Sequence, residues 1–407
     1  MSNNLYRLGT ANQYDMALRN IGQRQTSLSN LQENLTSGKR VVRASDDPVA
    51  AAQAERAQTR ISRNTTDLRA LDMQRNTMAL AESTLGEAGD AMQAFRALVV
   101  SAGNGTHTQT ERDAIAQQLV SLRDQILGYA NRNDANGLPL FQALGSAQTP
   151  FNGTTPAFNF AGLPGQNASS NTQIAKVLDG EAAWMSVPTG NGVFQVALNA
   201  GNTGKAWAEV GQVTNPSALT GQDYSITFSV VGGVTTYDVV NTTTATPVLS
   251  GQPYTSPSTI AFDGMSLKMT GAPNNGDSFD ISPSEQSNVF QVLENVIDTI
   301  RNGGNLDGST DFGGLTHGIT RGLTEIDSAM NRLQASRGLA GDLLNRADRI
   351  EGDLDTRAVQ LEADRSRAED LDMIKGLSDF QNQQVGYEAA LKSYSMVQKL
   401  SLFNFIS

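Results

Sequence analysis

The side chains that could carry catalysis or bind a metal are few in this chain and lie far apart. Its only histidines are His107, beside a glycine-rich turn, and His317, just inside a predicted helix start. The chain contains no cysteine, and transition-metal sites in proteins are built mostly from cysteine and histidine ligands. We therefore interpret both histidines as exposed polar residues and predict no metal site.

The carboxylates follow patterns that are typical of helix surfaces rather than of catalytic pairs. Near the C-terminal end, Asp353, Asp355, Glu362 and Asp364 alternate with Arg349, Arg357, Arg365 and Arg367. This spacing predicts ion pairs along a solvated helix face or between subunits. Residues 302–314 include Asp307 and Asp311 but lack the regular oxygen ligands and closing glutamate of a calcium-binding loop, so we interpret them as a flexible connector.

No glycine-rich segment has the spacing of a phosphate-binding loop. The sequence therefore predicts no catalytic residue and no cofactor, and we expect a protein that is not an enzyme. One alternative stays open, because Trp184, Trp207, Tyr224 and Tyr237 could line a glycan-binding or hydrolytic β domain carried on a coiled-coil stalk. Most aromatic residues in a small β domain, however, belong to its core.

The overall charge narrows the choice of partners. The chain has 407 residues and a net charge of −11, so a nucleic-acid backbone or an anionic membrane surface would repel it. Its first residues lack the apolar core of a cleavable secretory signal, and no apolar run approaches the roughly 18 residues of a membrane span. We expect neither nucleic acid nor membrane as a partner.

The elements that position these side chains begin with long helical arms at both chain ends. In the first arm, Tyr14, Leu18, Ile21, Leu28 and Leu35 recur at heptad spacing. The last arm repeats the same spacing over Ile319, Leu323, Ile326, Met330, Leu333, Ala340, Leu344, Ala347, Leu354 and Leu361. Alternating steps of three and four residues predict a coiled-coil seam.

Local signals mark where these helices begin and end. Gly38 predicts the end of the first helix. In the turn that follows, Ser45, Asp46, Asp47 and Pro48 predict a new helix start, since Asp47 can cap the free amides and proline fits the first helical position. Thr108 with Glu111 predicts a capping box for a third helix.

The middle of the chain has a different composition. Arginine is absent between Arg132 and Arg301, and every proline except Pro48 lies from Pro139 to Pro283. Residues 224–231 and 234–240 flank Gly232-Gly233 and predict a β-hairpin. Further strands are predicted at residues 193–198, 258–262, 266–269 and 278–281.

The predicted fold class is therefore a multidomain α+β protein, in which a long antiparallel helical coiled-coil bundle from both chain ends carries an inserted, mostly β middle domain. The expected boundaries are an N-terminal assembly helix at residues 1–40, bundle segments at 41–145 and 286–369, a β-rich insert at 146–285, and a C-terminal assembly helix at 370–407. The terminal helices have few neighbours within one chain. We predict that Ile21, Leu28, Leu35, Tyr387, Leu391, Tyr394, Leu402 and Phe403 form an assembly interface.

Four segments, in order, resemble the flagellin family, and in particular its members at the hook–filament junction. They are residues 43–52 (RASDDPVAAA), 130–137 (ANRNDANG), 276–283 (GDSFDISP) and 400–405 (LSLFNF). The resemblance covers about residues 1–145 and 276–407, whereas the middle domain matches no family by its residues.

The resemblance implies a structural protein of the bacterial flagellum, a ring-forming adaptor that joins the hook side to the flagellin filament. It implies export by the flagellar type III pathway to an extracellular position, without a cleavable signal. The implied partners are further copies of the chain, a hook-side junction protein, flagellin and a flagellar export chaperone. A filament-forming flagellin is the main alternative.

Overall fold

The computed structural model describes residues 10–142, 144, 149–154, 157–302 and 312–406. The chain divides into two compact units, one formed by Met1–Arg69 with Glu351–Ser407 and the other by Ala70–Ile350. Two long helices, α2 (Pro48–Ala102) and α5 (Phe312–Glu369), contribute to both units. The predicted combination of helical ends and a mostly β middle is confirmed.

In the first unit, α1 (Thr10–Ser37) and α6 (Met373–Ile406) lie side by side. Gly38 ends α1 with a φ of +70°, a left-handed conformation that glycine adopts without strain. The link after α1 is tied to the end of α5, because the Arg40 amide donates to the Glu369 carbonyl at 2.7 Å and the Leu371 amide donates to the Gly38 carbonyl at 2.9 Å.

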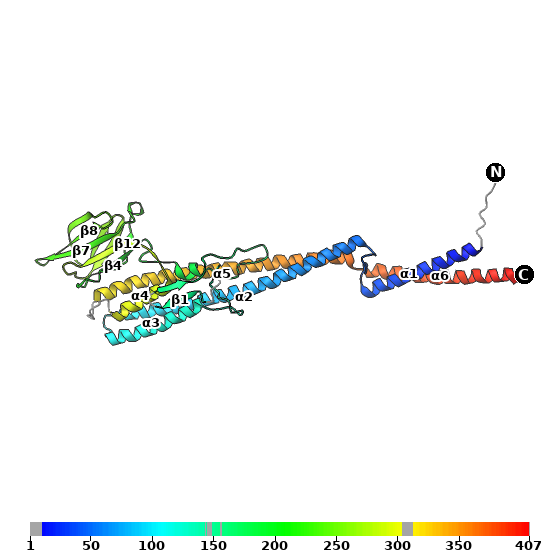
Figure 1. The fold of residues 1–407 in the computed structure, drawn as a ribbon, viewed down its shortest axis with the longest axis horizontal. Helices are drawn as coiled ribbons and strands as arrows, with labels where there is room; N and C mark the ends of the chain where they lie inside the picture. Colours follow the sequence, from blue (N-terminus) through cyan, green and yellow to red (C-terminus); the bar gives the residue numbers. More distant parts are fainter. Residues whose placement is uncertain (1–9, 143, 145–148, 155–156, 303–311, 407) are drawn as a thin grey trace. The chain divides into compact units, whose positions relative to one another are not determined.

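In the second unit, α2 and α5 lie side by side with α3 (Gln109–Ala130) and α4 (Val289–Asn302) (Figure 1). The predicted capping box at the start of α3 is confirmed, with the Thr108 hydroxyl accepting from the Glu111 amide. The heptad seams form the helical core, which includes Leu71, Met78, Leu85, Leu119, Val292, Val296, Ile326 and Leu333.

Ion pairs join the helices outside this core. Arg96 Nε lies 2.7 Å from Asp327 Oδ1, and Arg337 Nε lies 2.6 Å from Glu82 Oε1. Both pairs connect α2 with α5 near the surface, where exposed ion pairs contribute little to stability.

An aromatic cluster connects the start of the middle region to the helices. A short hairpin, β1 (Phe151–Thr154) with β2 (Ala157–Phe160), and a π-helical turn at Glu181–Met185 bring Phe151 and Trp184 against Phe290 of α4. The Trp184 and Phe290 rings stack with centroids 5.8 Å apart. Residues before the main β sheet therefore pack as part of the helical core.

The remainder of the middle region is a β domain. One sheet has the order β4-β12-β7-β8-β9, and a second joins β10, β11 and β5, with β6 also paired to β11. The bounds are β4 Phe194–Leu198, β5 Trp207–Ala208, β6 Gln212–Val213, β7 Tyr224–Val231, β8 Val234–Asn241, β9 Thr246–Pro253, β10 Ser258–Phe262, β11 Met265–Thr270 and β12 Ser278–Pro283. The predicted β7–β8 hairpin is confirmed, with Val231 paired to Val234 across the two glycines.

The chain enters and leaves this β domain through one narrow neck. Two short strands, β3 (Val187–Pro188) and β13 (Gln286–Ser287), pair antiparallel there. The Thr189 amide also donates to the Glu285 carbonyl at 3.0 Å. The two ends of the β domain are therefore neighbours in space. In the described residues no helix is both long and apolar enough to cross a membrane.

Candidate assembly interface

The histidine and acidic side chains considered above as possible catalytic or metal-binding groups do not form a common site in the described residues. Within the described part of the chain, no three His, Asp or Glu side chains gather closely enough to hold a metal ion. At the C-terminal end of α5 the carboxylates are paired locally, with Glu362 bonded to Arg365 at 2.5 Å and Asp364 to Arg367 at 2.6 Å. These helix-surface pairs follow the predicted pattern.

The interpretation of His317 as an exposed residue is wrong, since its side chain is only 5% exposed. Its Nδ1 lies 2.8 Å from the Ala208 carbonyl oxygen of β5, and its Nε2 lies 3.1 Å from that of Val196 in β4. Burial lowers the pKa of His317, and the nearby charge of Arg321 acts in the same direction while both carbonyls oppose it. His317 therefore joins α5 to the β domain.

A second buried group on α5 makes the same connection. Glu325 is 2% exposed and accepts a hydrogen bond from the Gly190 amide at 3.0 Å. Gly190 has a φ of +60°, and an added Cβ would collide with the Phe194 carbonyl oxygen. Neither contact was predictable from the sequence, because each joins a helix to backbone groups more than 100 residues away. His317 lies nine residues before Ile326 and so on the opposite side of α5 from that seam residue, which is why the heptad pattern gave no signal of this contact.

The aromatic residues that suggested glycan binding lie mostly in packed cores. Trp184, Tyr224 and Tyr237 are 0%, 1% and 8% exposed, respectively, and Trp207 is half-buried. The Tyr224 hydroxyl donates to Asp263 Oδ2 at 2.7 Å inside the β domain. A sugar ring needs accessible aromatic faces for stacking, so these residues give little support to the glycan-binding alternative.

The turn at residues 45–48 holds the start of α2. Asp47 Oδ1 accepts from the Ala50 amide at 3.0 Å and from the Val49 amide at 3.2 Å. These bonds, with that of Ala50 foremost, lower the pKa of Asp47, and its contact with Arg40 adds to the effect. Asp46 instead accepts from the Arg43 amide at 2.8 Å, which closes the preceding turn. Ser45 and Pro48 complete the turn, with Pro48 as the first residue of α2.

The residues predicted to form an assembly interface lie along α1 and α6. Ile21, Leu28 and Leu35 of α1 and Tyr387 and Tyr394 of α6 are half-buried where the two helices meet, whereas Leu391 is 42% exposed. Tyr394 packs edge-on against Tyr14 with ring centroids 6.0 Å apart. Leu402 and Phe403 lie in α6, but their side chains fall outside the described part of the structure. The assembly role of these residues stays a prediction.

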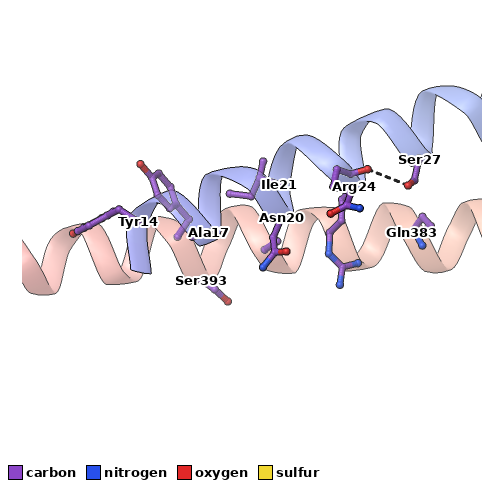
Figure 2. Close-up of a pocket in the computed structure, with 11 residues that line it drawn as sticks. Tyr14, Ala17, Asn20, Ile21, Arg24, Ser27, Gln383 and Ser393 are labelled. Carbon is purple, nitrogen blue, oxygen red and sulfur yellow. Dashed lines mark hydrogen bonds between the residues drawn. The ribbon is translucent and has the colours of Figure 1, made fainter. Parts of the chain in front are cut away.

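Between the two helices runs an open groove of about 720 Å³. Figure 2 shows Tyr14, Ala17, Ile21 and Arg24 of α1 along it, facing Gln383 and Ser393 of α6. Gly386 gives Arg24 room to cross α6, because an added Cβ there would collide with the guanidinium. The groove is open to solvent, so the residues that line it are accessible to another chain.

The α1–α6 pair leaves its apolar side chains largely uncovered. Among the side chains described in α1 and α6, none is buried. Large apolar residues are exposed along both helices, namely Met16, Leu18, Met373, Ile374, Leu377, Val385, Leu391 and Met396. Complete burial of one such side chain contributes about 1.5–3 kcal/mol. The pair therefore offers a surface that further helices could cover with a substantial gain in stability.

Comparison with known proteins gives matches at both helical ends. The family described as bacterial flagellin N-terminal helical region matches residues 9–145, and the bacterial flagellin C-terminal helical region matches residues 323–406. The β domain, which the sequence alone left without a family, matches the D2-like domain of flagellar hook-associated protein 1 over residues 197–283.

Among curated relatives, flagellar hook-associated protein 3 of Salmonella typhimurium is 31% identical over 153 residues, 38% of this chain and 48% of that protein. Its counterpart from Escherichia coli K12 is 33% identical over 145 residues, 36% of this chain and 46% of that protein. A flagellin of Clostridium tyrobutyricum is 34% identical over 121 residues, 30% of this chain and 32% of that protein. The chain thus matches less than half the length of these relatives.

Solved structures extend the likeness over more of the chain. The crystal structure of the flagellar junction protein FlgL from Legionella pneumophila has a TM-score of 0.67 and 26% identity, covering 73% of this chain and 99% of that one. A crystal structure of FlgL from Xanthomonas campestris has a TM-score of 0.68 and 25% identity, covering 77% of this chain and 99% of that one.

Proposed function

We propose that this chain, a member of the flagellin family, is a ring-forming adaptor that joins the hook side of a bacterial flagellum to its flagellin filament. The observation that carries the proposal is the α1–α6 pair, whose large apolar side chains stay exposed along both helices. Exposed apolar side chains that follow one helix pair are a feature of protein–protein interfaces. A subunit of an assembled structure would cover it with its neighbours.

Two findings favour the adaptor over a filament subunit. The β domain is similar to a domain of a hook-associated protein, and the relatives with the longest matches described above are hook-associated protein 3 from two bacteria. The flagellin matches, by contrast, reach about 30% of the chain. The second candidate, a filament-forming flagellin, rests on the helical ends that both groups share.

The proposed role requires protein partners and a position outside the cell. The chain binds copies of itself, a hook-side junction protein and flagellin, and an export chaperone holds it before secretion. It reaches an extracellular position on the flagellum through the type III export channel. Its role is structural and not catalytic, in keeping with the locally paired carboxylates of α5.

Deletion of the gene tests the proposal. Electron microscopy of the deletion strain should show hooks without filaments, and flagellin should accumulate in the medium as unassembled subunits. The full-length chain supplied on a plasmid should restore filaments. Normal filaments in the deletion strain would contradict the adaptor role. If the purified chain alone grew into long filaments, the flagellin candidate would be favoured instead.

A further inference from the structure

The β domain has a hydrophobic core of its own. Among the described residues, its buried apolar side chains and the half-buried ones packed against them all lie between Phe194 and Ile281, and none comes from a helix. The contact between the β domain and α5 is therefore not part of a shared apolar core. Domains joined by small or polar contacts usually move relative to each other.

The side of α5 that meets the β domain is polar. Gly313, His317, Arg321 and Glu325 follow one another at steps of four residues, which places them along one side of the helix. An added Cβ at Gly313 would lie 2.9 Å from the Lys205 carbonyl oxygen, so α5 begins in direct contact with the β domain. The buried side chains of His317 and Glu325 then meet backbone groups of the β domain. We call these two side chains the polar latch.

The charged groups around the His317 ring do not favour its protonated form. One turn along α5, Arg321 places a positive charge near the ring, and its guanidinium lies 3.6 Å from the Glu325 carboxylate. The strand β4 has no ionisable side chain. Glu209, directly after β5, and Asp280 of β12 are each bonded to another side chain of the β domain. Within the described residues, the buried ring thus has a cation and no carboxylate acting on it.

The neck provides a pivot. The two segments that carry the chain into and out of the β domain pair there over two residues each, Val187–Pro188 with Gln286–Ser287. All strands of the two main sheets lie beyond this point. The β domain could therefore turn about the neck without losing any hydrogen bond of its sheets.

We propose that the polar latch holds the β domain in one docked position on α5, and that protonation of His317 opens it, so that the β domain turns about the neck while both cores stay folded. A buried imidazolium beside Arg321 is unfavourable, whereas the ring of an undocked β domain is hydrated.

The direction of the pH dependence follows from the docked ring. Burial first, and then Arg321, lower the pKa of docked His317 below its ordinary value of 6.5, which the ring regains on undocking. Docking is therefore strongest above that pH and weakens as the pH falls below it. Each unit of difference between the two pKa values changes the docking equilibrium by about tenfold. This inference goes beyond the proposed function and does not depend on it.

Distance measurements between spin labels test the latch on the purified full-length chain, which has no cysteine of its own. Labels at Val234→Cys in the β domain and Gln334→Cys on α5 occupy exposed positions. Double electron–electron resonance should give one narrow distance distribution at pH 7.5 and a second, distinct distance at pH 5. The control pair Val234→Cys with Thr259→Cys lies within the β domain and should keep one distance at both pH values.

Two variants separate the latch from a general effect of acid. His317→Gln, which can donate to one carbonyl but does not titrate, should show the same distribution at both pH values. Glu325→Ala, which removes the acceptor of the Gly190 amide, should populate the second distance already at pH 7.5. An unchanged distribution in the parent at pH 5, or an equal response in His317→Gln, would overturn the proposal. Broadening of the control pair at pH 5 would also overturn it, because the β domain would then unfold instead of turning.

Discussion

Single polar side chains place the helices of this protein relative to their immediate neighbours. Asp47 satisfies two amides at the first turn of α2, and the ring nitrogens of His317 on α5 lie 2.8 Å and 3.1 Å from backbone carbonyl oxygens of β5 and β4. The partners of both side chains are backbone groups, which every residue type carries, so the interaction depends on the side chain of Asp47 or His317 itself. Because the pKa of each residue is lowered in the folded chain, substitution of either one should change how the stability of the protein depends on pH.

For Asp47, substitution by alanine should lower the melting temperature of the helical part by a few degrees, because two amides lose their acceptor. Pro48→Ala serves as the control and should have a smaller effect. Since the folded-state pKa of Asp47 is lowered from its ordinary value of 3.8, its contribution is complete above that pH and is lost as the pH falls through the folded-state pKa. Circular dichroism melts at pH 7 and pH 3 measure the melting temperatures of the variant and the parent, whose difference should shrink at pH 3. Equal melting temperatures at pH 7 would show that Asp47 is not a stabilising cap.

For His317, burial lowers the folded-state pKa below its ordinary value of 6.5. The unfolded chain then binds a proton more readily than the folded chain, so stability should fall as the pH drops below about 6.5. The variant His317→Gln, which does not titrate but can still donate to one carbonyl, should lack this part of the pH dependence. Melting followed by tryptophan fluorescence between pH 5 and pH 7.5 would test it, and identical pH profiles for the two proteins would count against the assignment.

At the scale of elements, the helices follow from the sequence more completely than the strands. The seam through Leu71, Met78 and Leu85 predicts α2 because heptad spacing maps directly onto one helix face. The strand β9 was missed, since Pro247, Gly251 and Pro253 interrupt its pattern.

The neck of the β domain allows a precise excision. Replacing residues 190–284 by a short glycine–serine linker should keep one cooperative melting transition in the helical remainder, because Thr189 and Glu285 are already hydrogen-bonded neighbours. A wider excision that joins Leu144 to Ser287 also removes Phe151 and Trp184 from Phe290. We expect it to cost about 3–5 kcal/mol, the usual range for losing a large buried aromatic residue. Chemical denaturation of the two variants would measure the difference; equal stabilities would show that the aromatic cluster contributes little.

The end of α6 should matter for assembly and not for the fold of the free chain. Removing residues 400–407 leaves every helical core residue named above in place, so the melting temperature should stay nearly unchanged. The truncated chain should nevertheless fail to restore filaments in the deletion strain, and flagellin should appear in the medium. Unfolding of the truncated chain would place these residues in the monomer core, and normal filaments would exclude them from the interface.

At the scale of the whole molecule, stability is distributed unevenly along the chain. The Ala70–Ile350 unit has a helical core with residues such as Met78, Phe95 and Leu333 at most 1% exposed, whereas no described side chain of α1 or α6 is buried. Ordering a residue costs about 1–2 kcal/mol of backbone entropy, which the incomplete burial of the α1 and α6 side chains offsets poorly. We therefore expect the terminal helices to open readily in the free chain and to become stable only between neighbouring subunits.

Amide hydrogen exchange, measured on the purified chain and on the same chain in isolated flagella, distinguishes open terminal helices from stable ones. In the free chain, the amides of residues 14–35 and 373–396 should exchange much faster than those around Met78 and Phe95 of α2. In isolated flagella, the terminal amides should become strongly protected, while those of the α2 core change little. Strong protection of the terminal helices already in the free chain, or unchanged fast exchange after assembly, would contradict the account.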